Sequence, residues 1–220
     1  MAGFDAMTTS QGRRPANARR AELLDQLRDL FLAEGFAHFT LDDLVARLHC
    51  SKSTLYTLAD SKEQLAVRVV AHYFKRATQR IEARVEAAQD VREKVRVYLD
   101  AAAEELRPAS RAFLDDLAAN LATRATYEAN AHAAADRIRG FIGEGVAQGV
   151  FREVHAGFVG ELVGHAIAAI QRGEIGERTG LSDAAAFEEL AQFLLGGLVA
   201  EQHTAHPAER GAPHGTEEEK

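Results

Sequence analysis

The 220 residues are 46% hydrophobic and 27% charged, which excludes a disordered chain and allows one large or two small domains. No apolar run approaches the roughly 18 residues of a membrane span, and no apolar segment follows Arg13 and Arg14 as it would in a signal peptide. The single cysteine excludes an internal disulfide. We therefore expect a cytoplasmic protein. The net charge of −7 is uneven: residues 1–90 hold 13 Lys and Arg against 12 Asp and Glu, and residues 91–220 hold 13 against 21, so nucleic acid would need a locally basic face near the N-terminus.

The composition predicts an all-α fold of about nine helices without strands, because Ala and Leu are abundant and β-branched residues are few. Residues 1–16 are small and polar, and we expect them to form a flexible arm. The first helix is predicted from about Ala18 to Glu34, where apolar residues recur at helical spacing. Gly35 then takes the place of a left-handed C-cap.

Residues 40–65 predict two short helices joined by a tight turn, followed directly by a third helix. Thr40 is a good N-cap for the first, with Asp43 in the position of a capping-box partner. His49 and Cys50 make the break, and Ser51 caps the second helix, roughly 52–58. A helix–turn–helix of this kind presents its second helix to the DNA major groove.

The remaining helices follow from capping signals and breaks. Ser61 and Gln64 form a further capping box, which opens a long helix. Pro108 and Gly149 each end a helical segment. The predicted helices cover 62–88, 91–106, 110–148 with a break near 118–124, 156–172 and 182–202, with a loop over GEIGERTG and a disordered tail over 203–220.

The N-terminal motif resembles the DNA-binding region of the TetR family of transcriptional regulators. The order and spacing match without an insertion at Leu24, Phe31, Glu34-Gly35-Phe36, Thr40, Leu44, Ala46, Ser51-Lys52, Thr54-Leu55-Tyr56, Ser61-Lys62-Glu63 and Leu65. The resemblance implies a three-helix DNA-binding domain over 17–65 and a helical bundle for ligand sensing and dimerisation over 66–202. It also implies a homodimeric regulator, more often a repressor, that leaves a palindromic operator when a small effector binds.

The candidate DNA contacts lie at helix starts. Free N–H groups and a hydroxyl at Thr40 can hold a phosphate oxygen, and the first turn of the second helix reaches base edges. The family uses the hydroxyl at Tyr56 as a phosphate contact. Simple capping at Thr40, a packed aromatic at Tyr56 and solvated arginines are the alternatives. The candidates are Thr40, Ser51, Lys52, Ser53, Thr54, Tyr56, Lys62, Arg19 and Arg20.

Two places depart from the family pattern. The turn carries His49-Cys50 where the family has Gly-Val, and histidine tolerates a left-handed backbone better than most residues. Cys50 is interpreted as a small apolar filler, with a redox switch as the alternative. After Tyr56 the chain has Thr57-Leu58-Ala59, which removes a phosphate donor and a packing aromatic, and Leu58 is expected to fill the gap.

The dimer is expected to use the two apolar C-terminal helices, 156–172 and 187–199, as an isologous four-helix interface. Internal core packing is the alternative for both. Two-fold symmetry would place the recognition helices about 34–36 Å apart. The interface candidates are Gly160, Gly164, Ala168, Phe193, Gly196 and Gly197.

The effector is predicted to be an apolar small molecule. Candidate pocket residues are isolated polar or aromatic groups on apolar helices: Tyr98, Phe113, Asn120, Tyr127, Phe141 and His165. No spacing predicts a metal site, a cofactor or a catalytic centre, so we do not expect an enzyme. Two alternatives stay open: control by a protein partner without a ligand, and a helical binding module or enzyme with a vestigial helix–turn–helix.

Overall fold

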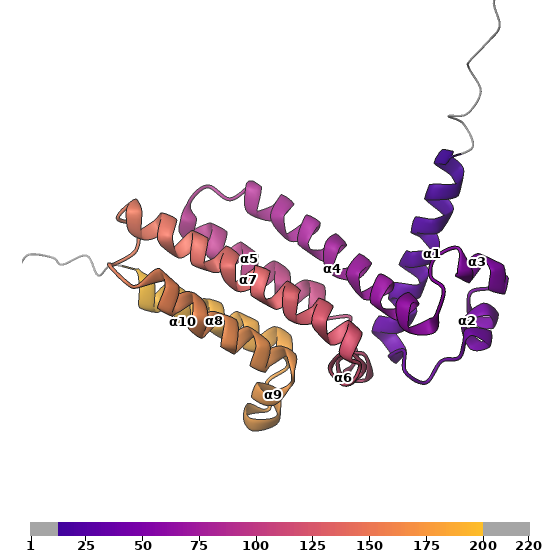
Figure 1. Cartoon of the computed structure of the whole chain (residues 1–220). Helices are drawn as coiled ribbons and strands as arrows, with labels where there is room; N and C mark the ends of the chain where they lie inside the picture. Colours follow the sequence, from indigo (N-terminus) through magenta and orange to yellow (C-terminus); the bar gives the residue numbers. More distant parts are fainter. Residues whose placement is uncertain (1–12, 200–220) are drawn as a thin grey trace, which may run out of the picture.

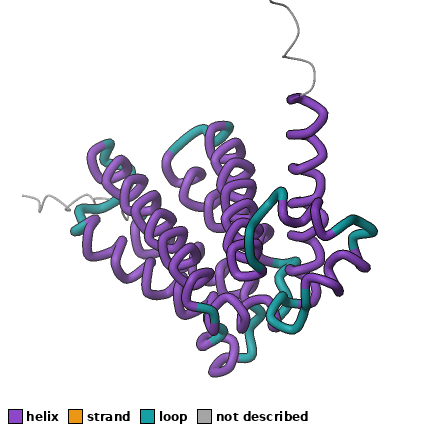
Figure 2. Tube along the Cα trace, turned by 45° about the vertical axis from the view of Figure 1, so that its right-hand side comes forward, coloured by secondary structure: helices purple, strands orange, loops and turns teal. Residues whose placement is uncertain are grey.

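The computed structural model describes residues 13–199, and this part of the chain folds entirely into helices and their connections (Figures 1 and 2). The expected tail, 203–220, and residues 1–12 of the expected arm lie outside the described residues. None of the described helices has the length and apolar character of a membrane span. The helices are α1 (Arg13–Glu34), α2 (Leu41–Arg47), α3 (Lys52–Tyr56), α4 (Lys62–Glu86), α5 (Val91–Leu106), α6 (Arg111–Ala119), α7 (Leu121–Ala147), α8 (Ala156–Gln171), α9 (Glu174–Thr179) and α10 (Asp183–Leu198).

The all-α prediction is confirmed, with two differences in detail. The described residues contain ten helices, because a short helix, α9, forms where a loop was expected; glycines with positive φ, Gly173 and Gly180, bracket it. The first helix begins at Arg13 rather than near Ala18, so the last residues of the expected arm are helical. The break predicted near 118–124 falls at Asn120, which ends α6 and caps α7.

Side-chain caps set the starts of the three helices that carry the motif. Thr40 accepts a hydrogen bond from the backbone N–H of Asp43, whose carboxylate accepts from the N–H of Thr40 in return. Ser51 accepts from the N–H of Thr54, and Ser61 from the N–H of Gln64. Each cap satisfies a backbone donor that would otherwise lack a partner, so these helix starts are fixed locally by sequence.

The connections between these helices need left-handed backbone at two positions. Gly35 has φ +78° after α1, as the C-cap prediction requires. His49 has φ +48° in the α2–α3 turn, and it is the one non-glycine residue with positive φ among those described. The backbone of His49 therefore has the left-handed conformation that was considered for this position, where the family pattern has glycine.

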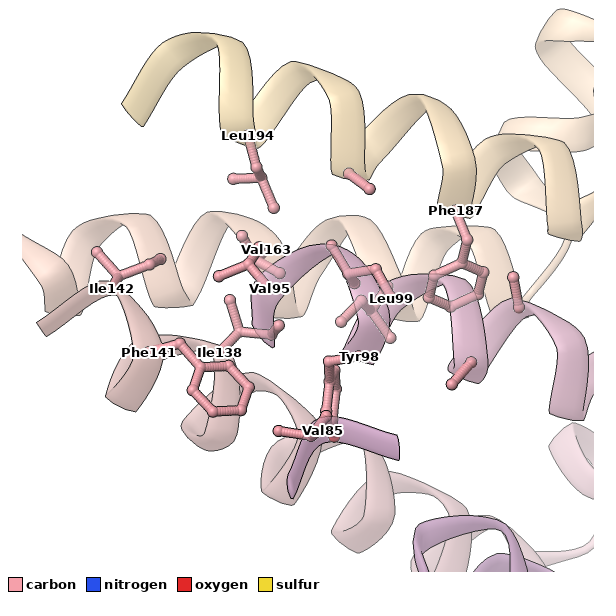
Figure 3. Close-up of a cluster of buried hydrophobic side chains, with 14 of the residues drawn as sticks. Val85, Val95, Tyr98, Leu99, Ile138, Phe141, Ile142, Val163, Phe187 and Leu194 are labelled. Carbon is pink, nitrogen blue, oxygen red and sulfur yellow. The ribbon is translucent and has the colours of Figure 1, made fainter. Parts of the chain in front are cut away.

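Two hydrophobic cores share the long helix α4. The N-terminal half of α4, with Leu65, Val69 and Phe74, packs in a core with α1–α3. Its C-terminal half, with Ile81 and Val85, packs in a second core with α5, α7, α8 and α10 (Figure 3). The first core also includes side chains from α6 and α7, so this core extends beyond residue 65, where a domain boundary was expected.

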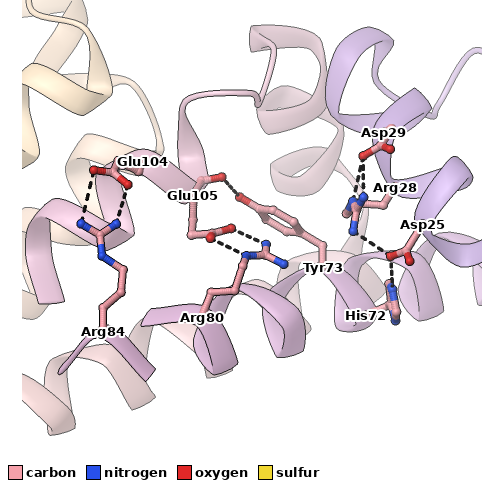
Figure 4. Close-up of polar contacts among 9 residues, drawn as sticks. All are labelled: Asp25, Arg28, Asp29, His72, Tyr73, Arg80, Arg84, Glu104 and Glu105. Carbon is pink, nitrogen blue, oxygen red and sulfur yellow. Dashed lines mark hydrogen bonds and ion pairs between the residues drawn. The ribbon is translucent and has the colours of Figure 1, made fainter. Parts of the chain in front are cut away.

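Polar contacts fix the faces of α4 to α1 and α5 (Figure 4). On one side, His72 lies 2.8 Å from the carboxylate of Asp25 on α1, which also pairs with Arg28 at 2.7 Å. Burial raises the pKa of Asp25, but the hydrogen bond from His72 and the charge of Arg28 outweigh it and hold that pKa below its usual value. On the other side, the buried Tyr73 hydroxyl donates to the carbonyl oxygen of Glu105 on α5 at 2.7 Å.

Candidate nucleic-acid interface and internal cavity

The recognition helix α3 has one apolar face and one polar face. Leu55 packs inward, and Leu58 directly after the helix is also buried, so it fills the gap left by the missing aromatic. Lys52 and Ser53 in the first turn are exposed, Thr54 is half-buried, and the Tyr56 side chain is 50% exposed. Tyr56 is therefore not a packed core aromatic, and its ring stands on the same short helix as the predicted base-reading residues.

Hydroxyl groups at the starts of α2 and α3 already have hydrogen-bond partners within the chain. The Ser51 hydroxyl lies 2.8 Å from both the Ser53 and the Thr54 hydroxyl oxygens. The Thr40 hydroxyl donates to the Asp43 carboxylate at 2.6 Å, and this bond lowers the pKa of Asp43. These hydroxyls keep acceptor lone pairs at an exposed surface, but Thr40 brings a negative charge with it.

Two predicted lysines have acceptors within the chain. Lys52 forms an ion pair with Asp42 on α2 at 2.7 Å, and the hydrogen bond from its ammonium group to that carboxylate raises the pKa of Lys52. Lys62 donates to the backbone carbonyl of Ala37 at 2.6 Å and is half-buried. Lys62, a predicted phosphate contact, lies in this structure at the junction between α4 and the α1–α2 turn.

The N-terminal arginines differ in their placement. Arg19 lines a groove of about 470 Å³ together with His49 and Thr54, so α1, the turn and the recognition helix meet there. Arg20 is exposed on α1 and does not line this groove. His49 was treated in the sequence only as a turn residue, although an exposed ring beside a recognition helix is itself a candidate DNA contact. The presence of a histidine at a turn position where the family usually has glycine is the sequence signal for such a contact.

Cys50 is half-buried beside this turn, and burial raises the pKa of its thiol. A raised pKa reduces the thiolate fraction, which is the reactive form. This environment favours the small apolar filler over the redox switch.

The C-terminal bundle encloses a cavity of about 220 Å³ between α4, α5, α7, α8 and α10. Its floor is buried and apolar, with Leu99, Ile167 and Phe187. Exposed residues on the α4 and α7 sides, Thr78 and Ala133, place its mouth between those helices. The volume lies between an engineered cavity of about 150 Å³ that binds benzene and the roughly 300–1,000 Å³ typical of drug-sized ligand pockets.

Of the six predicted pocket residues, the cavity is lined by Tyr98 alone. Phe113 packs in the N-terminal core with its ring 6.0 Å from that of Tyr73, Tyr127 is buried 5.9 Å from Phe74, and Phe141 lies behind Tyr98 at 5.9 Å. Asn120 caps α7, and His165 is exposed on α8 with its ring bonded to the carbonyl of Glu161. Helical period identified buried faces correctly, but it could not indicate which buried faces enclose a void.

The predicted dimer residues divide into two groups. A Cβ at Gly160 would meet the Cβ of Arg139 at 2.9 Å, and one at Gly164 would meet the Cβ of Ala135 at 3.0 Å. These glycines therefore allow α8 to approach α7 within the chain, which corrects their assignment to the partner. Ala168 is half-buried, whereas Phe193, Gly196 and Gly197 are exposed on α10. Next to them in the fold, α8 exposes Phe158 and Leu162, which sequence reasoning missed.

A side chain of α6 holds the turn between α1 and α2. One carboxylate oxygen of Asp116 accepts hydrogen bonds from the backbone N–H groups of Phe36, at 2.5 Å, and Ala37, at 2.8 Å. The N–H of Ser110 before α6 donates to the carbonyl of Leu32 on α1 at 2.7 Å. The loop that leads from α1 into α2 is thus held directly by α6, which packs in the same N-terminal core.

Comparison with known proteins agrees with this geometry. Residues 23–69 match the family model described as bacterial regulatory proteins, tetR family. No curated protein matches the chain in sequence.

Solved structures resemble the whole fold at low sequence identity. A transcriptional regulator of the TetR family from Agrobacterium tumefaciens has a TM-score of 0.66 and 18% identity, covering 84% of this chain and all (100%) of that one. A Saccharomonospora viridis protein in complex with choline has a TM-score of 0.64 and 20% identity, covering 84% and 99%. The regulator FadR from Bacillus subtilis in complex with stearoyl-CoA has a TM-score of 0.62 and 12% identity, covering 80% and 97%.

Proposed function

We propose that the chain is a DNA-binding transcriptional regulator of the tetR family, whose model matches residues 23–69, and that it acts as a ligand-released repressor. It binds a palindromic operator as a homodimer, and a small molecule in the cavity of the C-terminal bundle lowers its affinity for DNA. The proposal is carried by two features observed together. Helix α3, the candidate recognition helix, is exposed, and α4, the next helix along the chain, lines a separate cavity.

DNA binding is assigned to α3 and its surroundings. Tyr56 and Ser53 are exposed on α3, and Arg19 with His49 borders the adjoining groove. Tyrosine and serine hydroxyls hydrogen-bond to phosphate oxygens, and arginine adds charge to the same backbone. Lys52 reaches DNA only by leaving Asp42, so part of the positive charge of α3 is neutralised in the free protein.

Dimerisation is assigned to the exposed apolar faces of α8 and α10. Phe158, Leu162 and Phe193 are 62%, 55% and 79% exposed, and large apolar side chains gain about 1.5–3 kcal/mol each when fully buried. Gly196 and Gly197 have no neighbouring atom within 4 Å of an added Cβ, so a partner helix can approach closely. Burying this face against a second copy would also pair the two recognition helices for a palindrome.

Release follows from the shared helix and from α6. Ala77 and Ile81 of α4 line the cavity, and Lys62 at the start of the same helix holds the α1–α2 turn. Asp116 of α6 holds the same turn. A ligand that fits the cavity better when α4 is displaced would move Lys62 relative to this turn, and that difference in affinity is what shifts the population away from the DNA-bound form. An internal cavity also favours a small ligand over control by a protein partner alone.

Selection of bound duplexes from a random pool tests the operator. We expect a palindrome with half-sites about one helical turn apart and an affinity that falls steeply with salt. Gel shifts on the selected site should then show Tyr56→Phe and Lys52→Ala each reducing affinity about five- to tenfold, with the circular dichroism spectrum unchanged. Unchanged affinity in both variants would exclude α3 as the DNA contact, and half-sites without symmetry would exclude the dimer.

A further inference from the structure

Among the described residues, one side chain that lines the cavity has a buried polar atom without a hydrogen-bond partner. Gln171, at the end of α8, is only 6% exposed, and its Oε1 atom is buried and accepts no hydrogen bond from the described residues. A buried amide without a partner costs free energy that a bound group can recover. Because Gln171 lines the cavity beside the apolar residues Ile167 and Phe187, a ligand placed there would reach it.

The charged groups around the cavity are already neutralised. Arg137 forms two parallel hydrogen bonds to Glu82, of 2.9 and 2.7 Å, and its guanidinium lies 4.4 Å from the centre of the Phe141 ring. The other carboxylate in the lining, Glu105, is bonded to Arg80, with Nε at 2.6 Å (Figure 4). A charged ligand would have to break one of these partly exposed pairs or enter the buried apolar part of the cavity without a counter-ion, and the latter is costly.

A second, smaller void lies on the other side of Gln171. It has about 30 Å³ and is also lined by Tyr127, whose hydroxyl is the other buried polar atom without a partner in the described residues. This void is the size of about one water molecule and cannot hold an organic ligand. Gln171 lines both voids, whereas Tyr127 lines the smaller one and not the cavity, so Tyr127→Phe tests the smaller void separately.

From this chemistry we infer that the cavity binds a neutral, mostly apolar molecule of one or two rings that carries a hydroxyl group, which hydrogen-bonds to the amide of Gln171. The inference rests on the proposed function only for its consequence at the operator. The apolar walls supply most of the affinity, and the hydroxyl supplies selectivity. The volume of about 220 Å³ excludes a long acyl chain with its carrier, and the paired carboxylates and arginines exclude small ions.

Calorimetric titration of the full chain with 4-ethylphenol and 4-ethyltoluene tests this directly, because the two probes differ by a hydroxyl in place of a methyl group. The ratio of their dissociation constants is measured in the wild type, in Gln171→Leu and in Tyr127→Phe. We expect the preference for the phenol, measured by this ratio, to be about fivefold greater in the wild type than in Gln171→Leu. This is the effect expected of one neutral hydrogen bond. Tyr127→Phe should keep the wild-type ratio, and choline and benzoate should not bind.

Gln171→Met provides a second variant should the branched leucine disturb α8, and urea unfolding checks both. An equal ratio in wild type and Gln171 variants, a ratio that changes in Tyr127→Phe instead, or absence of binding by both probes would overturn the inference. The gel shift separates it from the proposed function. Selective phenol binding without operator release leaves the ligand class intact and refutes the release mechanism. Release by choline or benzoate, with no phenol binding, refutes the ligand class and leaves the release mechanism intact.

Discussion

The carboxylate of Asp116 on α6 accepts the backbone N–H of Phe36 across eighty residues of sequence, and it accepts the N–H of Ala37 as well. Both donors belong to the turn that leads into the helix–turn–helix, and Gly35 in the same turn needs positive φ. A single side chain of α6 thus satisfies two backbone donors of the α1–α2 turn.

Asp116→Ala should uncouple these two parts. The two N–H groups lose a charged acceptor, and because they are partly solvated we expect a loss of about 1–3 kcal/mol in the free energy of unfolding, measured in urea. The variant should lose more of its effector-dependent release from the operator than of its affinity for the operator. Asp115→Ala is the matched control, since that neighbouring carboxylate pairs with Arg111 on the exposed side of α6. Equal effects from both variants would contradict a coupling role.

Asp42→Asn should strengthen DNA binding. In the free protein Asp42 pairs with Lys52 and places a negative charge beside α3. Its removal frees the lysine for phosphate and removes a like-charge repulsion, so we expect affinity to rise about two- to fivefold at low salt, with a steeper dependence on salt in gel shifts. Asp29→Asn on α1, a carboxylate paired with Arg28, serves as the control. A fall in affinity for Asp42→Asn would mean that the pair positions α3.

Phe193→Glu should convert the protein to a monomer. The side chain is 79% exposed on α10, so the isolated fold tolerates the change, whereas a symmetric interface would bury two carboxylates against each other. Sedimentation velocity should show half the mass, and affinity for the palindrome should fall by more than tenfold. Leu121→Glu, at a 73% exposed position at the start of α7, should leave the mass unchanged.

Tyr98→Phe should change the stability of the protein at alkaline pH. Burial raises the pKa of Tyr98 to about 12, above its usual value near 10. A tyrosine with a raised folded-state pKa contributes stability that is fully present below pH 10 and is lost as pH rises toward 12, because the unfolded chain ionises first. In the wild type, the free energy of unfolding should therefore fall as the pH rises through this window. In Tyr98→Phe the fall should be less steep, by up to about 1.4 kcal/mol per pH unit. Identical slopes would indicate that the ring is hydrated.

Local signals in the sequence predicted local structure well. The caps at Thr40, Ser51 and Ser61 and the left-handed Gly35 and His49 are confirmed because each depends on residues within one turn. Features that depend on distant packing were beyond reach of this reasoning. Helical period cannot tell whether Gly160 faces α7 or a second chain, nor that Lys62 bonds to Ala37 instead of extending toward DNA.

The sharing of α4 between the two cores has a consequence for how the protein can be divided. A fragment ending at residue 65, the boundary expected from the family motif, would retain α1–α3 but would lose Val69 and Phe74 from their core, together with Phe113 and Leu117 of α6. The helix–turn–helix would then expose its apolar underside to water. We therefore expect a fragment that contains α1–α3 without α4 and α6 not to fold as an independent unit.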